Sequence, residues 1–129
     1  MAKKRDYTTL YKGHEGQWAW VAHRVTGLAV IFFLFAHILD TAAMGWGPHA
    51  YDGIMRIYEN VPVRLLELGL VSCVVYHALN GIRIMLVDFW PKLADRQKQL
   101  FYGTLGAFVL AEIPIALIMG NQALDLLKH

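Results

Sequence analysis

The sequence contains few charged residues and a single cysteine. Only 17% of its 129 residues are charged, and Cys73 is the one thiol. A lone cysteine excludes an internal disulfide and a cysteine-based metal site within this chain. The first residues are basic and polar and lack a short apolar run followed by a small-residue cleavage site, so we do not expect a signal peptide. Asp6 and Glu15 are untypical of a transit peptide.

Apolar residues are abundant and gathered into three runs. Hydrophobic residues make up 57% of the chain, whereas soluble domains contain about 45–50%, and a soluble domain of this size could not bury the excess. The runs cover residues 20–44, 61–87 and 100–119, and each approaches the roughly 20 residues that cross about 30 Å of hydrocarbon. They predict an all-α membrane protein: one domain over residues 1–129, with a tail at 1–17 and transmembrane helices near 18–45, 61–89 and 99–121.

Basic residues predict the orientation of these helices. They concentrate in the N-terminal tail and in the loop after the second run, at Lys3, Lys4, Arg5, Lys12, Lys92, Arg96 and Lys98. The loop between the first two runs has Arg56 beside Asp52 and Glu59. The positive-inside rule therefore places the N-terminus and the second loop in the cytoplasm, and the first loop and the C-terminus outside. No patch interleaves basic with aromatic residues, so we expect no nucleic-acid partner.

Turn and cap residues indicate where the helices begin and end. Gly45 to Pro48 should end the first helix. Asn60 is a suitable N-cap for the second, and Pro62 is tolerated in a first turn. Pro114 predicts a kink in the third, which should end at Gly120 and Asn121. The segment 48–59 is expected to form a short interfacial helix.

Several ionisable residues lie inside the apolar runs, where they are costly and are functional candidates by default. They are His23, Arg24, His37, Glu67, His77, Arg83 and Glu112, with Asp88 at an edge. Each also has a structural interpretation. A single histidine often makes an interhelical hydrogen bond, and an arginine near a boundary often extends to the headgroups.

Helical geometry separates two of these histidines in depth. His23 and His37 lie within about 40° of one helix face and roughly 21 Å apart. His77 lies about 16 Å from the cytoplasmic end of its helix at Asp88, and His37 about 22 Å from the same side. His77 should thus be nearer the cytoplasm and His37 nearer the outside. Imidazoles at two heights suit two cofactors stacked across the membrane.

Haem fits this arrangement better than zinc does. No thiolate or carboxylate converges with either imidazole, as a zinc site would need, while a proton relay stays open. Haem iron takes an axial histidine and its macrocycle suits apolar surroundings, and Arg24 and Arg83 are cations for the propionates. Small residues would let the ring approach the helices, at Gly27, Ala36, Ala78 and Gly81. With one histidine at each level, a second axial ligand must come from a partner chain.

Two segments carry a family resemblance. The stretch WAWVAHRVTGLAV resembles the HR-[ST]-G opening of the cytochrome b membrane-anchor subunit of succinate:quinone oxidoreductase, the succinate dehydrogenase of complex II. The stretch YHALNGIRIMLVDFW resembles the H-x3-G-I-R…D signature of that family's second helix. The two helices cover about half of the chain and look most like the actinobacterial diheme branch.

The resemblance implies roles for particular residues. His77 would bind the iron of the proximal haem b, and His37 that of the distal haem. His23 and Arg24 would lie at the haem propionates and the cytoplasm-facing quinone pocket, with Thr26 as the small hydroxyl residue of that motif. Near the propionates and the quinone, the resemblance also implies Arg83 and Asp88.

The same resemblance implies the protein's assembly and activity. The three helices would form half of a haem-binding bundle, which a second membrane-anchor subunit completes. An iron–sulfur subunit and a flavoprotein subunit would dock on the cytoplasmic face of a bacterial cytoplasmic membrane. This chain would not itself oxidise succinate. It would carry electrons through two b haems to menaquinone.

Two positions depart from the family pattern. Ile84 stands where many members have a histidine near a propionate, and Trp20 stands where many ubiquinone-reducing members have a serine. Because Trp20 would reshape an inner quinone pocket, an outer quinone site is an alternative. Its polar candidates are Trp46, His49, Tyr51 and Tyr58.

Other functions remain open from the sequence. One is a single-haem anchor in which His37 only forms a hydrogen bond; another is a fumarate reductase anchor. A third is a small transporter or proton-channel subunit that uses the histidines and glutamates. Glu112 could carry protons from the outer side, although a protonated or paired carboxyl facing the partner is the favoured interpretation.

Overall fold

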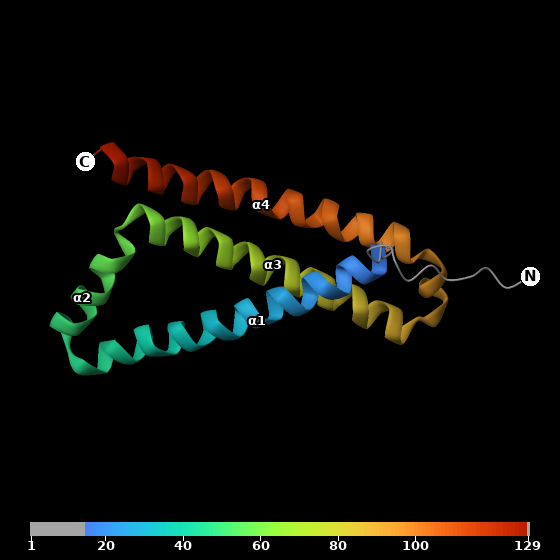
Figure 1. Ribbon diagram of the computed structural model, residues 1–129, viewed down its shortest axis with the longest axis horizontal. Helices are drawn as coiled ribbons and strands as arrows, with labels where there is room; N and C mark the ends of the chain where they lie inside the picture. The colour runs from blue at the N-terminus through green and yellow to red at the C-terminus, as the bar shows by residue number, and fades with distance from the viewer. Residues whose placement is uncertain (1–14, 129) are drawn as a thin grey trace, which may run out of the picture.

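The computed structural model describes residues 15–128, and these residues are almost entirely helical (Figure 1). The helices are α1 (Glu15–Ala42), the 3-10 helix η1 (Ala43–Trp46), α2 (Pro48–Tyr58), α3 (Val61–Phe89), the 3-10 helix η2 (Pro91–Arg96) and α4 (Gln97–Lys128). Within residues 15–128, three segments are long and apolar enough to cross a membrane: Gly16–Trp46, Val61–Phe89 and Pro91–Lys128. The protein is therefore an all-α membrane protein with three candidate transmembrane helices. Lys3, Lys4, Arg5 and Lys12, whose charges predict a cytoplasmic N-terminus, lie outside the described residues.

The helix ends follow local sequence signals, with one exception. Asn60 is the N-cap of α3 and Pro62 lies in its first turn. Gly47 adopts a φ of 103°, which favours glycine, and it separates η1 from α2. The exception is α4, which continues through Gly120 and Asn121 to Lys128 instead of ending near residue 121. A glycine within a helix costs only about 1 kcal/mol relative to alanine, so it does not by itself end one.

The three long helices are unevenly spaced along their length (Figure 1). α1 and α3 cross near the start of α1 and diverge toward the other end, where α2 bridges the wide gap between them. α4 runs beside α3. Residues near the crossing therefore lie between two helices, whereas α1 beyond the crossing has neither α3 nor α4 against it among the described residues and meets α2 only near Asp40.

Few side chains are buried, because three helices form a thin layer. Ala19, Ala43, Tyr76 and Ala123 are the buried hydrophobic residues among those described, and Asn80 is the buried polar one. Large apolar side chains on α1 point outward, and Phe32 is 66% exposed. A surface of this kind is stable against lipid or against another membrane helix, but not in water.

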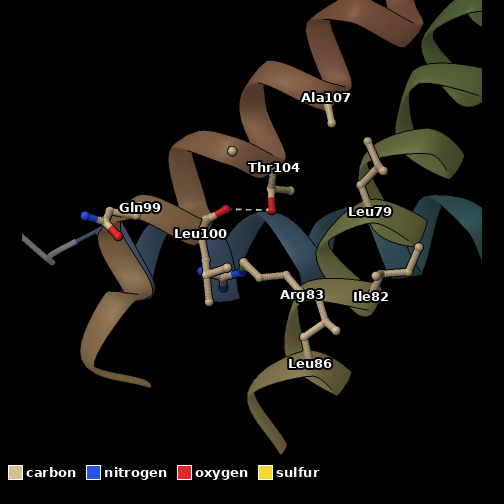
Figure 2. Close-up of a pocket in the computed structure, with 9 residues that line it drawn as sticks. Leu79, Ile82, Arg83, Leu86, Gln99, Leu100, Thr104 and Ala107 are labelled. Carbon is tan, nitrogen blue, oxygen red and sulfur yellow. Dashed lines mark hydrogen bonds between the residues drawn. The ribbon is translucent and has the colours of Figure 1, made fainter. Parts of the chain in front are cut away.

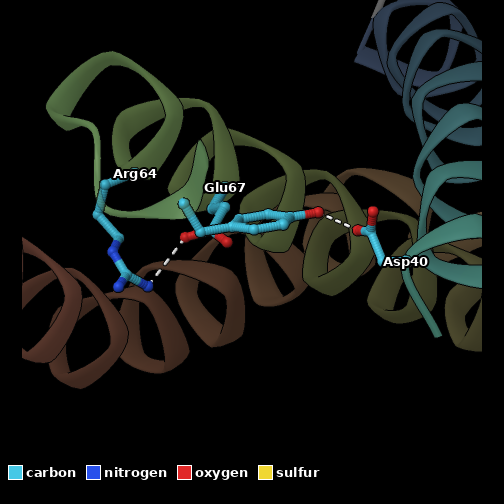
Figure 3. A network of polar contacts seen from close by, with 4 residues as sticks. Asp40, Arg64 and Glu67 are labelled. Atoms are coloured by element: carbon cyan, nitrogen blue, oxygen red, sulfur yellow. Dashed lines mark hydrogen bonds and ion pairs between the residues drawn. The ribbon is translucent and has the colours of Figure 1, made fainter. Parts of the chain in front are cut away.

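A polar network joins the helices at their wide end (Figure 3). The Tyr58 hydroxyl of α2 donates a hydrogen bond to Asp40 Oδ2 of α1. Nearby on α3, Arg64 Nη1 lies 3.1 Å from Glu67 Oε2. The hydrogen bond to Asp40 raises the pKa of Tyr58 to about 12, with smaller contributions from burial and from the negative charges of Asp40 and Glu67. The neutral phenol thus links α2 to α1.

The Tyr58–Asp40 link predicts a stability difference that disappears at high pH. The pKa of Tyr58 is raised from 10.0 to about 12 in the folded protein. The contribution of this tyrosine to the stability of the fold is therefore complete below pH 10, and it is lost as the pH rises through the pKa of the folded protein. The Tm of the purified complex should exceed that of Tyr58→Phe by a constant amount up to pH 10, and by less above it. Tyr51→Phe, on the same helix, is the control; a wild-type advantage that grows above pH 10 would contradict the link.

Candidate functional site

Two imidazoles stack at the crossing of α1 and α3. The ring centroids of His23 and His77 are 4.1 Å apart and their planes differ by 10°. Each histidine begins an H-x3-G sequence, His23 to Gly27 on α1 and His77 to Gly81 on α3. The two helices are antiparallel, so the sequences meet with a local two-fold relation.

Each imidazole packs against the glycine of the other helix. A Cβ atom added at Gly27 would lie 3.0 Å from His77 Cε1, which is closer than side chains normally approach. One added at Gly81 would lie 3.8 Å from His23 Cε1, an ordinary contact. The glycines therefore make room for the rings, and the clearance at Gly27 is the smaller of the two.

Contacts with α1 orient the His77 ring. Its Nδ1 lies 3.2 Å from the backbone oxygen of His23 and 3.4 Å from Thr26 Oγ1. A carbonyl oxygen only accepts hydrogen bonds, so these contacts assign the proton to Nδ1. The same hydroxyl lies 2.8 Å from the oxygen of Ala22, so Thr26 can donate there and accept from His77. This tautomer leaves the Nε2 lone pair of His77 free.

Asn80 also belongs to this region, and it was not among the residues predicted from the sequence. The side chain is fully buried, its Oδ1 accepts a 3.0 Å hydrogen bond from Arg83 Nε, and its Nδ2 has no partner within residues 15–128. His23 Nδ1 is likewise buried without a partner there. The missed signal was the spacing of His77, Asn80 and Arg83 at three-residue intervals, because only ionisable residues were considered.

The other residues predicted for the cytoplasmic end do not join the stacked pair. Arg24 is exposed, and its guanidinium lies 4.7 Å from the centroid of the Trp20 ring. Asp88 is exposed and forms no ion pair with any described residue. Arg83 is half-buried and lines a groove between α3 and α4. The structure thus brings together His23, Thr26 and His77. Arg24, Arg83 and Asp88 lie outside this cluster.

His37 lies in the second half of α1, where the helices have diverged. Its side chain is exposed and stacks on Phe33, with centroids 5.7 Å apart, and has no polar partner within residues 15–128. Because the His77 ring packs against α1 between His23 and Gly27, His37 is about 15–21 Å from His77 along α1. The depths derived from the sequence differed by only about 6 Å, because they were counted from assumed membrane boundaries rather than from the contact between the helices.

Glu112 lies between α3 and α4 within this chain. Its Oε2 is 2.9 Å from Ser72 Oγ, and its Oε1 is buried without a partner among the described residues. Ser72 Oγ is also 2.9 Å from the oxygen of Leu68. The predicted pairing of Glu112 is therefore present, but its partner is a serine of this chain rather than a group on another subunit.

Of the outer quinone candidates, His49 lines a hollow on α2. A hollow of about 320 Å³ on α2 is lined by His49, Asp52, Arg56 and neighbouring residues, and Trp46, Tyr51 and Tyr58 are not among them. Tyr58 is instead bonded to Asp40. At the end of the described chain that is predicted to face outside, Tyr58 therefore links α2 to α1.

Comparison with known proteins identifies the family of this chain. The model of the succinate dehydrogenase/fumarate reductase transmembrane subunit family matches residues 3–116. The succinate dehydrogenase 2 membrane subunit SdhC of Mycobacterium tuberculosis is 39% identical over 117 residues, covering 91% of this chain and 86% of that relative. The succinate dehydrogenase hydrophobic membrane anchor subunit of Halobacterium salinarum is 39% identical over 103 residues, covering 77% and 78%. The chain belongs to the succinate dehydrogenase/fumarate reductase transmembrane subunit family, and it serves as a membrane anchor.

Proposed function

We propose that this anchor binds two b haems together with a second membrane subunit and carries electrons from an iron–sulfur subunit to menaquinone. The observation that carries the proposal is the orientation of His77, whose Nδ1 is held by α1 while Nε2 is free. Neutral imidazole with its far nitrogen fixed by a backbone carbonyl is the form that binds iron. We favour a complex that oxidises succinate over one that reduces fumarate, because both relatives are named as succinate dehydrogenase subunits.

The residues around His77 fit a haem. The groups in contact with His77 are the His23 ring, Thr26 and Gly27, and the apolar runs to which both helices belong supply the surroundings that the macrocycle requires. When bound, haem supplies a one-electron carrier within the membrane. Thr26 and the backbone of His23 hold the imidazole in its orientation, and Arg24 supplies a cation near the predicted cytoplasmic boundary for a propionate or a quinone oxygen. The roles that the resemblance gives Arg83 and Asp88 at the propionates stay predictions.

His37 is proposed as the ligand of the second haem. An exposed imidazole without a polar partner inside the chain is costly at bilayer depth unless another molecule pairs with it. A haem shared with the second membrane subunit would cover both His37 and the apolar surface of α1. In the single-haem alternative, His37 instead forms a hydrogen bond with the partner subunit.

The orientation and the soluble partners are part of the proposal. The excess of basic residues in the 91–98 loop supports a cytoplasmic position for that loop and for the N-terminus. The flavoprotein and iron–sulfur subunits would dock on this side of a bacterial cytoplasmic membrane. His77 is nearer to that side than His37, so electrons would reach the His77 level first.

Counting haems in the intact purified complex tests this proposal. Wild type should contain two b haems for each flavin, and His37→Ala and His77→Ala should each contain one. His49→Ala, an exposed histidine on α2, is the matched control and should keep two. Flavin content and size-exclusion profile show whether each variant assembles.

The alternatives give different counts. One haem in both wild type and His37→Ala would refute the second site, and a complex without haem absorbance would favour a transporter or channel subunit. One haem lost on replacing His37 but none on replacing His77 would refute the role of His77.

A further inference from the structure

Asn80 is the fully buried polar residue among residues 15–128, in a thin layer of helices where most side chains are exposed. Tyr76, one turn earlier on α3, packs edge-on against Phe108 of α4, with ring centroids 5.8 Å apart. His77 stacks instead on His23 of α1. At about 100° per residue, Asn80 lies about 40° around α3 from Tyr76 and about 60° from His77. The amide therefore lies between the face of α3 that meets α4 and the face that meets α1.

The Asn80 amide determines the direction of the Arg83 side chain. Asn80 Oδ1 accepts a 3.0 Å hydrogen bond from Arg83 Nε. Arg83 itself lines a groove between α3 and α4, together with Gln99 and Thr104 of α4 (Figure 2). Asn80 lies about 60° closer to the His77 face of α3 than Arg83 does, so the hydrogen bond draws the guanidinium toward that face. An arginine near a membrane boundary would otherwise extend toward the headgroups.

The same hydrogen bond fixes the orientation of the amide. The opposite orientation would set the NH2 group of Asn80 against the Nε–H of Arg83, a donor against a donor. Within residues 15–128, Nδ2 of Asn80 has no partner, so the hydrogen bond to Arg83 is the one that this side chain makes there. Because Asn80 has no exposed surface, a movement of its side chain would displace packed neighbours. Arg83 is thus attached to a rigid acceptor.

The charge of Arg83 stays available in this orientation. No carboxylate among the described residues forms an ion pair with it, and its terminal nitrogens have no partner there. A guanidinium of this kind binds a carboxylate through two parallel hydrogen bonds. Six residues separate His77 from Arg83, which is about 9 Å along α3 toward the predicted cytoplasmic end. The propionates of a haem held by His77 are carboxylates of the required chemistry.

We propose that Asn80 is a positioning residue that directs the Arg83 guanidinium toward a propionate of the haem held by His77. This inference rests on the proposed function, because it requires a haem at His77. A positive charge fixed beside the haem favours its reduced form, since reduction adds an electron. Without the amide, the guanidinium extends toward the loop end of α3, and the reduced haem loses part of this stabilisation.

Redox titration of the intact purified complex tests this role. Asn80→Leu replaces the amide by an apolar side chain of similar size, and Asn80→Ala is a second variant that cannot overpack the site. Both should keep the haem content of wild type and shift one haem, the one that His77→Ala removes, to a lower reduction potential. Asn121→Leu, the same change at an exposed position of α4, is the matched control and should keep the wild-type potential. A purely structural role would lower the Tm or the haem content without this shift.

A double-mutant cycle tests whether Asn80 acts through Arg83. Arg83→Lys keeps the positive charge and removes the Nε donor, so Asn80→Leu should have little further effect in that background. At a fixed applied potential, the combined change in the ratio of oxidised to reduced haem should depart from additivity by at least about twofold, as for residues in contact.

The other outcomes contradict the inference in distinguishable ways. An unchanged potential in both Asn80 variants, or additive shifts in the cycle, would overturn it and leave the proposed function intact. Loss of the His77 haem from both Asn80 variants would show that the amide is structural. A raised KM for menaquinone at an unchanged potential would assign Arg83 to a quinone instead. A wild-type complex without haem would overturn the proposed function and this inference together.

Discussion

Replacing Gly27 by alanine is expected to displace His77 and to lower the haem content of the complex, whereas the same change at Gly81 should leave it unaltered. The added Cβ would meet His77 Cε1 at 3.0 Å in the first case and His23 Cε1 at 3.8 Å in the second. Overpacking of this kind costs about 1–3 kcal/mol. To avoid the clash, the His77 ring must leave the oxygen of His23, and its orientation is then lost.

The matched pair separates a steric effect from a general effect on the helices. Both glycines are helical, and alanine is the better helix former at each. Haem per flavin, the reduction potential of the haem and the Tm should change for Gly27→Ala and stay near wild type for Gly81→Ala. Equal effects of the two substitutions would show that the clearance around His77 is unimportant.

Ser72→Ala should destabilise the complex, and Glu112→Gln should not. A serine hydroxyl has one proton, yet Ser72 Oγ lies 2.9 Å from both the oxygen of Leu68 and Glu112 Oε2. Both bonds form together when the Glu112 side chain donates to Ser72, and Ser72 donates to Leu68. Glutamine can also donate to Ser72, so it preserves the arrangement. Alanine at position 72 leaves the half-buried acid of Glu112 unpaired, at a cost of about 1–3 kcal/mol.

Thermal unfolding and turnover together decide the role of Glu112. We expect a lower Tm for Ser72→Ala, and a normal Tm, turnover and proton stoichiometry for Glu112→Gln. Ser72→Ala combined with Glu112→Ala should recover part of the stability, because no polar group is left without a partner. Loss of turnover in Glu112→Gln at normal Tm would instead support proton transport by this carboxyl.

The helices could be predicted from the sequence because each element has its own local signal. The apolar runs have the length of a membrane span, and Pro62 and Gly47 mark helix boundaries. The end of α4 could not be predicted, since Gly120 and Asn121 are compatible with both a helix end and a helix interior. Tertiary context decides between these two states.

The residues of the site could be predicted from the sequence, but their arrangement could not. The residue types of His23, Thr26 and His77 were recognised from the motifs, but their stacking depends on the register of two helices, which neither helix encodes alone. Asn80 was missed because an amide is neutral and does not stand out in an apolar run. The divergence of α1 from α3, which leaves His37 exposed, depends on α2 at the other end.

The facing H-x3-G sequences also fix how far α1 can slide along α3. In the native register, each imidazole faces a glycine. A slip of one turn, about 5.4 Å, in one direction would set Gly27 opposite Gly81 and leave a void. A slip in the other direction would press His23 directly against His77 with no glycine beneath either ring. A single register satisfies both histidines, so two short motifs hold the helices in axial alignment, with no ion pair between α1 and α3 among residues 15–128.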